Sequence, residues 1–467
     1  MLHDNSGDAV AAYGNVPGVT GHAKRYLIYV VALTWLVLVL RSVDLLVISV
    51  LMPSIKTQFT VSNTQLGLLS GFAFSLFYGL LAVPIAWLAD RTSRARIISI
   101  SVFVWSSMTA LSGMANTFGH LLLARVGVGL GEAGGTAPVY ALVADYAPAN
   151  KRASVFAILN SSVPIGVLLG FLLGGYVSSA FGWRYAFLFA GIPGLAVALL
   201  AQVTLREPVR ADSTTACTPG APLIETLRYL FSRHSYCHFV LGSAVFTLGS
   251  VGSGIWISTY FIQFHHMQPS ELGVWLALLY GGGGLVGALG GGYLTDHVVN
   301  KGGDQRWYAW MPGISSVAIL PFTIFVYSWP SPRQALLVHL VTTILAHVWA
   351  GPVYGTVQGL AGKNRRAVAA AVNSLLVSFL AYGLGPLLVG VASDHFRASL
   401  GQDALRYSIM LLAAVAYTWA GIHFLLAGRT LRADLALALT AEPGSRHQST
   451  AAAVVDGAFV SSSAGSM

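Results

Sequence analysis

Charge and cysteine are both scarce in this sequence. Only 9% of the 467 residues are charged, against about 25% in an ordinary soluble domain. A water-soluble globular protein of this length needs more polar surface than 26 Lys and Arg with 17 Asp and Glu provide, so that class is excluded. The only cysteines are Cys217 and Cys237, which excludes a disulfide framework or a thiolate metal cluster.

Signatures of ATP use and of catalysis are also missing. No Gly-x-x-x-x-Gly-Lys-[Ser/Thr] stretch occurs, so ATP-driven pumping is not indicated. No nucleophile and base cluster at one end of the apolar segments, as a multispan membrane enzyme requires. His265 and His266 are adjacent but have no carboxylate or third ligand nearby in sequence. We therefore expect neither an enzyme, nor a metal site, nor a cofactor.

Long apolar runs dominate the chain. Hydrophobic residues make up 55% of it, and a helix needs about 20 such residues to cross a bilayer. Twelve stretches meet this requirement, which predicts an all-α membrane protein with twelve transmembrane helices. Their expected limits are 26–52, 64–89, 96–115, 119–146, 151–178, 184–204, 235–263, 271–297, 306–329, 333–361, 365–394 and 405–429.

The basic residues fall mainly on one side of these spans. The net charge of +9 invites a nucleic-acid hypothesis, but 19 of the 26 Lys and Arg lie on the side that holds the termini and 5 on the other. Cytoplasmic loops carry such an excess, so we expect both termini in the cytoplasm, a plasma-membrane (bacterial inner-membrane) location and no nucleic-acid partner. Asp4 and Asp8 interrupt the first residues, which do not resemble a cleavable signal peptide.

The chain divides into two halves that repeat. Pro138-Val139-Tyr140 and the loop after it reappear 214 residues later, with 8 of 16 positions identical. Between the halves, apolar residues recur at helical spacing beside arginines, which indicates a helix on the membrane surface. We expect a cytoplasmic tail (1–25), a six-helix bundle (26–204), a linker with an amphipathic helix (205–234), a second six-helix bundle (235–429) and a disordered tail (430–467).

Two six-span halves with these motifs resemble the major facilitator superfamily. The loop from Ala86 to Arg96 is similar to that family's cytoplasmic gating motif, although Ala86 and Ser93 replace two glycines. Span four carries Arg125-x-Gly127-x-Gly129-x-Gly131-Glu132, like the family's Arg/Gly motif. The runs from Gly131 to Pro138 and from Gly182 to Phe187 resemble the spinster-like branch. This resemblance implies a proton-coupled transporter, with lysolipid or sphingolipid cargo in animal relatives.

Ionisable residues within spans are costly, so each is a functional candidate. Arg41 and Asp44 share a face of span one, and Arg125 and Glu132 share a face of span four. The resemblance places both spans at the central cavity, where Asp44 and Glu132 are the candidate proton carriers. The chain departs from the relatives, which have Asn three residues before this Asp and Arg just after it, where this chain has Arg41 and Leu45. A static ion-pair network is the structural alternative.

Charges at the predicted cytoplasmic loops are candidates for a gate. By resemblance to the gating motif, they form ion pairs that hold the inner side shut when the cavity opens outward, with simple solvated loop charge as the alternative. These residues are Asp90, Arg91, Arg94, Asp145 and Arg152, with Asp296 at the position equivalent to Asp90 in the second half.

The second half offers few charges and many aromatic residues. Together with Tyr140 they are candidates to line an amphipathic substrate cavity, with packing or interfacial anchoring as the alternative for each. They are Trp256, Tyr260, His347, Trp349, Tyr354, Asn373 and Tyr382. His347 is of special interest, because imidazole titrates near neutral pH.

We expect a proton-driven secondary transporter that moves an amphipathic, anionic or zwitterionic solute resembling a lysolipid by alternating access, acting as a monomer among membrane lipids. The alternatives are a symporter of small carboxylic or aromatic acids, a drug efflux antiporter and, from another class, a membrane sensor that does not transport.

Overall fold

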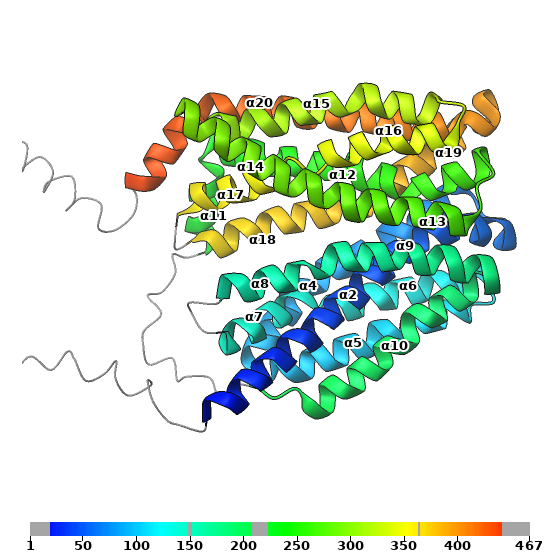
Figure 1. Cartoon of the computed structure of the whole chain (residues 1–467), viewed down its shortest axis with the longest axis horizontal. Helices are drawn as coiled ribbons and strands as arrows, with labels where there is room; N and C mark the ends of the chain where they lie inside the picture. Colours follow the sequence, from blue (N-terminus) through cyan, green and yellow to red (C-terminus); the bar gives the residue numbers. More distant parts are fainter. Residues whose placement is uncertain (1–18, 148–151, 208–222, 363–364, 441–467) are drawn as a thin grey trace, which may run out of the picture.

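A computed structural model describes residues 19–147, 152–207, 223–362 and 365–440. All regular structure in these ranges is helical. The longest helices are α2 (Val19–Phe59), α12 (His234–Phe264) and α20 (Ala404–Thr440). The described chain begins and ends at one end of the molecule, which we call the near end, and the opposite end is the far end (Figure 1).

The first half is built from helices that run between the two ends. After α2 they are α3 (Asn63–Gly67), the π-helix η1 (Leu68–Phe72), α4 (Ala73–Arg91), α5 (Arg94–Gly113), α6 (Phe118–Glu132), α7 (Thr136–Tyr146), α8 (Arg152–Asn160), α9 (Ser162–Phe181) and α10 (Trp183–Thr204). Local sequence sets several boundaries. Ser93 and Thr117 cap α5 and α6 by accepting hydrogen bonds from backbone N–H groups, and Gly182 separates α9 from α10 at φ +91°.

The second half begins with the short helix α11 (Leu223–Phe231), within the expected linker. After α12 come α13 (Pro269–Ala277), the π-helix η3 (Leu278–Gly283), α14 (Gly284–Gly302), α15 (Trp307–Ser328), α16 (Pro332–Leu345), α17 (Ala350–Ala361), α18 (Arg366–Leu376), the π-helix η5 (Val377–Leu384), α19 (Gly385–Leu400), the 3₁₀ helix η6 (Gly401–Asp403) and α20.

Helix breaks repeat in the two halves. α17 begins 214 residues after α7, and α18 begins 214 residues after α8. The span that contains α6 and α7 is interrupted just before α7, and the span that contains α16 and α17 is interrupted just before α17. The spacing is that of the sequence repeat, so the repeat extends to the local backbone.

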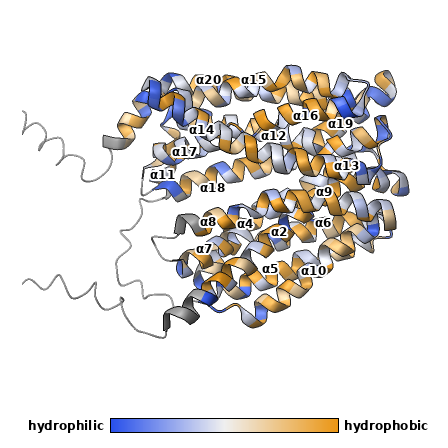
Figure 2. Cartoon of the chain, viewed as in Figure 1, coloured by the Kyte–Doolittle hydropathy of each residue, from blue (hydrophilic) through white to orange (hydrophobic). Residues whose placement is uncertain are grey.

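Ten helical stretches in the described ranges are long and apolar enough to cross a membrane, and the expected count of twelve is not confirmed. Two places account for the difference. The expected span 119–146 is divided into α6 and α7, each shorter than a full span. The expected spans 365–394 and 405–429 join into one stretch, Val368–Ala438, because only η6 separates them. Apolar residues fill the middle of the helices and polar residues gather toward their ends (Figure 2).

The halves pack against each other at the far end. The main contacts there pair α9 with α13, α3 with α19, and α2 with α12. One hydrophobic core cluster spans this contact and includes Val47, Phe171 and Trp256, while two others lie within single halves. Gly175 and Gly273 allow the close approach of α9 and α13, since a Cβ on either would come within 2.5 Å of a backbone oxygen across the contact. The molecule is therefore closed at its far end.

Candidate functional site

The four charged residues predicted within spans one and four meet in two pairs between α2 and α6. Arg125 donates two hydrogen bonds to Asp44, at 3.2 Å to Oδ1 and 3.1 Å to Oδ2. Arg41 Nε lies 2.9 Å from Glu132 Oε2. Each arginine thus pairs with the carboxylate of the other helix, and the cluster has no net formal charge.

The two pairs differ in hydrogen bonding. Asp44 also accepts a hydrogen bond of 2.6 Å from Thr109 Oγ1 of α5, so both of its oxygens are occupied. Glu132 is fully buried, yet neither of its oxygens has a hydrogen bond of proper geometry to any residue that the structure describes. The charge of a buried carboxylate in this position is compensated mainly by Arg41, with a smaller contribution from Arg125. Both oxygens of Asp44 are occupied, whereas Glu132 retains capacity for a proton or a ligand.

Arg41 faces the space between the halves. Its side chain keeps 20% of its surface exposed, against 2% for Arg125. The guanidinium lies over the Tyr78 ring at 5.4 Å, and the hydroxyl groups of Tyr140 and Tyr382 are within electrostatic range. Tyr382 belongs to η5 of the second half, so the Arg41–Glu132 pair is positioned where relative motion of the halves changes its surroundings.

The sequence missed two of these contacts. Thr109 and Tyr78 complete the surroundings of Asp44 and Arg41, but hydroxyl-bearing residues are common in apolar helices and neither is costly to bury when hydrogen-bonded. Polar residues recur every three positions along α5, at Ser106, Thr109 and Ser112, and so share one face of the helix. This spacing is the one sequence signal that indicates contact of this face with other polar groups.

The candidates for the substrate cavity lie in several places. Tyr354 and Tyr382 keep 47% and 38% of their surface exposed. Tyr140 donates a hydrogen bond to Asn160 Oδ1 at 2.7 Å, beside the Arg41 cluster. These three tyrosines remain near open space in the structure.

The other aromatic and polar candidates have buried partners. Trp256 donates to the carbonyl of Pro386 at 2.9 Å, and Tyr260 donates to the carbonyl of Tyr327 at 3.0 Å near the far end. Asn373 accepts a hydrogen bond from Ser243, and Trp349 packs between aromatic rings of the second half. The structure does not bring these four to the Arg41 cluster.

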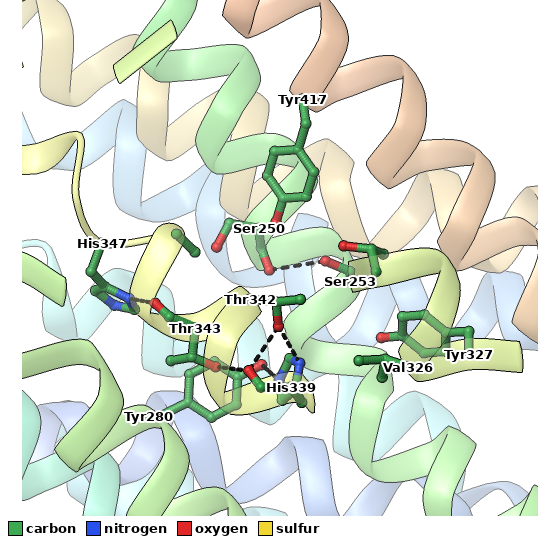
Figure 3. A pocket seen from close by; sticks show the side chains of 12 residues that line it. Ser250, Ser253, Tyr280, Val326, Tyr327, His339, Thr342, Thr343, His347 and Tyr417 are labelled. Carbon is green, nitrogen blue, oxygen red and sulfur yellow. Dashed lines mark hydrogen bonds between the residues drawn. The ribbon is translucent and has the colours of Figure 1, made fainter. Parts of the chain in front are cut away.

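His347 belongs to a small polar pocket inside the second half (Figure 3). The pocket has a volume of about 30 Å³, enough for a water molecule. His339 lies within 2.7 Å of Thr342 Oγ1 and within 3.3 Å of the Tyr280 hydroxyl. The Tyr280 ring stacks on Phe171 of the first half, with ring centroids 5.5 Å apart. A second titratable group, His339, thus accompanies His347 and connects to the contact between the halves.

The gate candidates lie at the near end. Arg94 forms an ion pair with Asp145, which joins α5 to α7 within the first half. Arg91 stacks on the Trp87 ring at 3.8 Å, and Asp296 accepts a hydrogen bond of 3.0 Å from the Tyr308 hydroxyl. The side chains of Asp90 and Arg152 lie outside the described part of the chain. The Arg94–Asp145 pair is present while the far end is closed.

No group of three or more His, Cys, Asp or Glu side chains in the described ranges is arranged to hold a metal ion. In particular, His265 lies 3.2 Å from the Tyr260 hydroxyl and packs against aromatic rings.

The fold and the paired charges between α2 and α6 are those of a membrane transporter. Residues 34–386 match the family model of the Major Facilitator Superfamily, and the chain belongs to this superfamily of transporters, which are not enzymes. The more particular resemblance is to spinster proteins. A crystal structure of a bacterial homologue of the human lysosomal transporter Spinster, inward-facing and unoccupied, is 28% identical, covers 90% of this chain and 99% of its own, and superposes with a TM-score of 0.80.

Two further relatives agree with this assignment. An MFS-type efflux pump of Mycolicibacterium smegmatis is 27% identical over 89% of this chain and 95% of its own length. The sphingosine-1-phosphate transporter SPNS2 of Danio rerio is 27% identical over 80% of this chain and 78% of its own. The predicted superfamily and its spinster-like branch are confirmed.

Proposed function

We propose that this protein is a proton-coupled secondary transporter of an amphipathic, anionic or zwitterionic solute resembling a lysolipid, and that Glu132 carries the proton. The observation that supports this most directly is the incomplete hydrogen bonding of Glu132 beside Arg41. A buried carboxyl group whose only close partner is one arginine takes up or releases a proton when that arginine moves.

The geometry separates the roles of the two carboxylates. Asp44 is held by Arg125 and Thr109 through three hydrogen bonds, and we assign it to holding α2, α5 and α6 together. Glu132 faces Arg41, whose guanidinium reaches toward Tyr382 of the second half. When the halves move, Arg41 changes its surroundings, and Glu132 exchanges a proton. Of the two carboxylates that the sequence offers as proton carriers, we assign the role to Glu132.

The character of the cavity walls supports the proposed substrate class. The first half holds the charged groups around Arg41, and in the second half Tyr354 and Tyr382 keep 47% and 38% of their surface exposed; we take these groups as the two walls of the substrate cavity. An ionic headgroup and an apolar body fit these two walls. The zebrafish relative is named for a phosphorylated sphingoid lipid, which agrees with a lysolipid-like cargo, and the mycobacterial relative is named for efflux.

The proposed membrane topology, location and oligomeric state rest on the sequence. We propose twelve spans in an inner membrane, both termini in the cytoplasm, a monomer among membrane lipids, and the proton gradient as driving force. The near end then faces the cytoplasm, and a far end closed as in this structure corresponds to the inward-facing state of an alternating-access cycle.

Flux driven by a pH gradient in proteoliposomes tests the proposal. The substrates are a lysophospholipid panel and a carboxylic-acid panel, and Glu132→Gln is compared with wild type. We expect lysophospholipid flux to follow the gradient in wild type and to lose this dependence in Glu132→Gln, which should still bind the substrate. Glu271→Gln is the matched control, because Glu271 is exposed at the far end, where its nearest cation is Arg333 at 3.8 Å.

Other outcomes identify the alternatives. Flux of the carboxylic acids alone indicates a symporter of small carboxylic or aromatic acids, and export of unrelated cations indicates a drug antiporter. Binding without flux indicates a membrane sensor. Gradient-driven flux that persists in Glu132→Gln contradicts the assignment of Glu132 and directs the search to His347.

A further inference from the structure

A large cavity lies at the far end, apart from the Arg41 cluster and on the other side of the closed contact between the halves. Its volume is about 820 Å³, and both halves line it. The first half contributes residues between Lys56 and Asn63, at the end of α2 and the start of α3. The second half contributes residues from the end of α12, the end of α19, and the turn through η6 into α20.

The lining of this cavity is cationic. Lys56, Arg397 and Arg406 line it together with His266, and no Asp or Glu is among its lining residues in the described chain. Arg406 has a counterion, since it lies 3.3 Å from Asp403. Lys56 and Arg397 have none within ion-pair distance among the residues that the structure describes. Two arginines and a lysine around one space attract an anion of matching size.

The nearby carboxylate offsets these charges only in part. Asp394 is within electrostatic range of Lys56, but its oxygens accept hydrogen bonds from the backbone of Asn63 and Thr64, at 3.0 and 2.7 Å. Lys56 Nζ instead donates to Asn63 Oδ1 at 2.5 Å, and Arg397 lies within electrostatic range of Lys56 as well. Repulsion between two cations is thus left in place beside the cavity.

The backbone around the cavity is also unusual. Thr60 and His266 are the only non-glycine residues with positive φ in the described chain, both at 54°, and both line this cavity. The left-handed region is costly for a residue branched at Cβ such as threonine. Backbone strain of this kind collects at ligand sites. Here it shapes the two walls, one in each half.

We propose that this cavity binds a small organic polyanion, a di- or tricarboxylate or a phosphate monoester, from the solution or the lipid surface at the far end. Lys56 of the first half and Arg397 and Arg406 of the second contact its anionic groups. Because the ligand touches both halves, it stabilises the far-end-closed state and slows the opening of that end. This role is separate from transport through the Arg41 cluster.

Citrate is the probe for the soluble anion. The full-length protein in detergent is titrated with sodium citrate, and with sodium chloride at equal ionic strength, while the thermal unfolding midpoint and the heat of binding are measured. We expect a saturable rise in midpoint with citrate alone. Lys56→Gln and Arg397→Gln should each weaken binding about tenfold, because each removes one charge-assisted hydrogen bond. Arg333→Gln, at the same end but outside the lining, should bind as wild type does.

Nanodiscs distinguish the two sources of the anion. Phosphatidylglycerol in place of phosphatidylcholine weakens citrate binding if an anionic headgroup occupies the site, and leaves it unchanged if the ligand is soluble. Either result supports an oxyanion site when Lys56→Gln weakens citrate binding relative to wild type. A citrate response no larger than that of chloride, or one equal in wild type and both variants, overturns the proposal. Lys56 and Arg397 both lie at the far end. Thermal unfolding midpoints equal to that of wild type in the absence of citrate establish that Lys56→Gln and Arg397→Gln fold.

Discussion

At the scale of single residues, the two ion pairs between α2 and α6 differ in burial and in hydrogen bonding. Arg125 and Asp44 are each about 2% exposed, and Thr109 completes the hydrogen bonding of the carboxylate. Arg41 reaches partly open space, while Glu132 is buried without a hydrogen bond of good geometry to the described residues. A buried carboxylate with both oxygens hydrogen-bonded keeps its charge, and one without such bonds responds to changes around it. The contrast predicts different costs for two similar substitutions.

Asp44→Asn should destabilise the protein strongly. It leaves the charge of Arg125 buried without a counterion, a change that costs about 3–5 kcal/mol. Glu132→Gln should cost much less, because Arg41 is 20% exposed and can be hydrated. Unfolding by heat or denaturant in detergent, followed by circular dichroism, measures the difference. Equal stability of the two variants would show that the Asp44–Arg125 pair is not the structural one.

At the scale of helices, glycines set how closely α6 packs on its neighbours. A Cβ on Gly131 would lie 2.5 Å from the backbone nitrogen of Trp105 in α5, and one on Gly129 would meet the carbonyl oxygen of Phe74 in α4. Backbone atoms cannot move aside as a flexible side chain can. The Arg/Gly pattern of the sequence is therefore a packing pattern, which also places the adjacent Glu132 opposite Arg41.

Gly131→Ala should lower the free energy of unfolding by about 1–3 kcal/mol, the usual cost of overpacking, and reduce proton-coupled flux because Glu132 is displaced. Gly79→Ala in α4 is the matched control, since a Cβ there meets nothing within 4 Å. It should leave stability unchanged or slightly raised, as alanine is the better helix former. Unfolding and flux measurements on both variants check this. Equal effects of the two substitutions would disprove the packing argument.

The turn between α14 and α15 is joined to α20 by a carboxylate outside the spans. Hydrogen bonds from the Arg306 side chain, with others from its backbone and from Arg432, lower the pKa of Asp304 to about 2 from an ordinary 3.8. A lowered pKa contributes stability above the ordinary value, which is lost as the pH falls through the folded-state value. The contact should therefore persist throughout the neutral range.

Asp304→Asn should lower the unfolding midpoint at pH 7, and its difference from wild type should shrink as the pH falls from 3.8 to about 2. The effect is small and decreases with added salt, because the group lies at the surface and is only partly buried. Arg432→Gln, which removes one partner at 2.9 Å, should show the same pH dependence at reduced size. Thermal scans over this pH range measure both. A difference that grows at low pH would contradict the assigned sign.

At the scale of the whole molecule, the sequence predicted what is local or costly and missed what depends on docking. Arg41, Asp44, Arg125 and Glu132 could be found because charges within apolar spans are rare. Their cross-pairing could not, since it depends on the relative positions of α2 and α6. The hydrogen bonds that Asp394 accepts from Asn63 and Thr64 join residues 331 and 330 positions apart and exist only because the two halves meet. Apolar patterning says nothing about such pairs.

These hydrogen bonds predict how the far end is held shut. Asp394 of α19 accepts bonds from the backbone nitrogens of Asn63 and Thr64 and from the Thr64 hydroxyl, at 3.0, 2.7 and 2.7 Å. Alternating access requires this contact to break when the far end opens. Asp394→Asn removes the charge and one acceptor, at a cost of about 1.5–3 kcal/mol. It should raise the population of the far-end-open state at least about tenfold.

Labelling of a cysteine at the closed contact measures that population. Ser49 is fully buried there and bonds to the carbonyl of Ile255 at 2.8 Å, so Ser49→Cys, in a background without Cys217 and Cys237, reports opening. A maleimide that cannot cross the membrane should label it at least about tenfold faster in Asp394→Asn. Glu271→Gln, at the same end, should leave the rate unchanged. Equal labelling with and without Asp394 would mean that the packing of α9 on α13, rather than this carboxylate, keeps the far end closed.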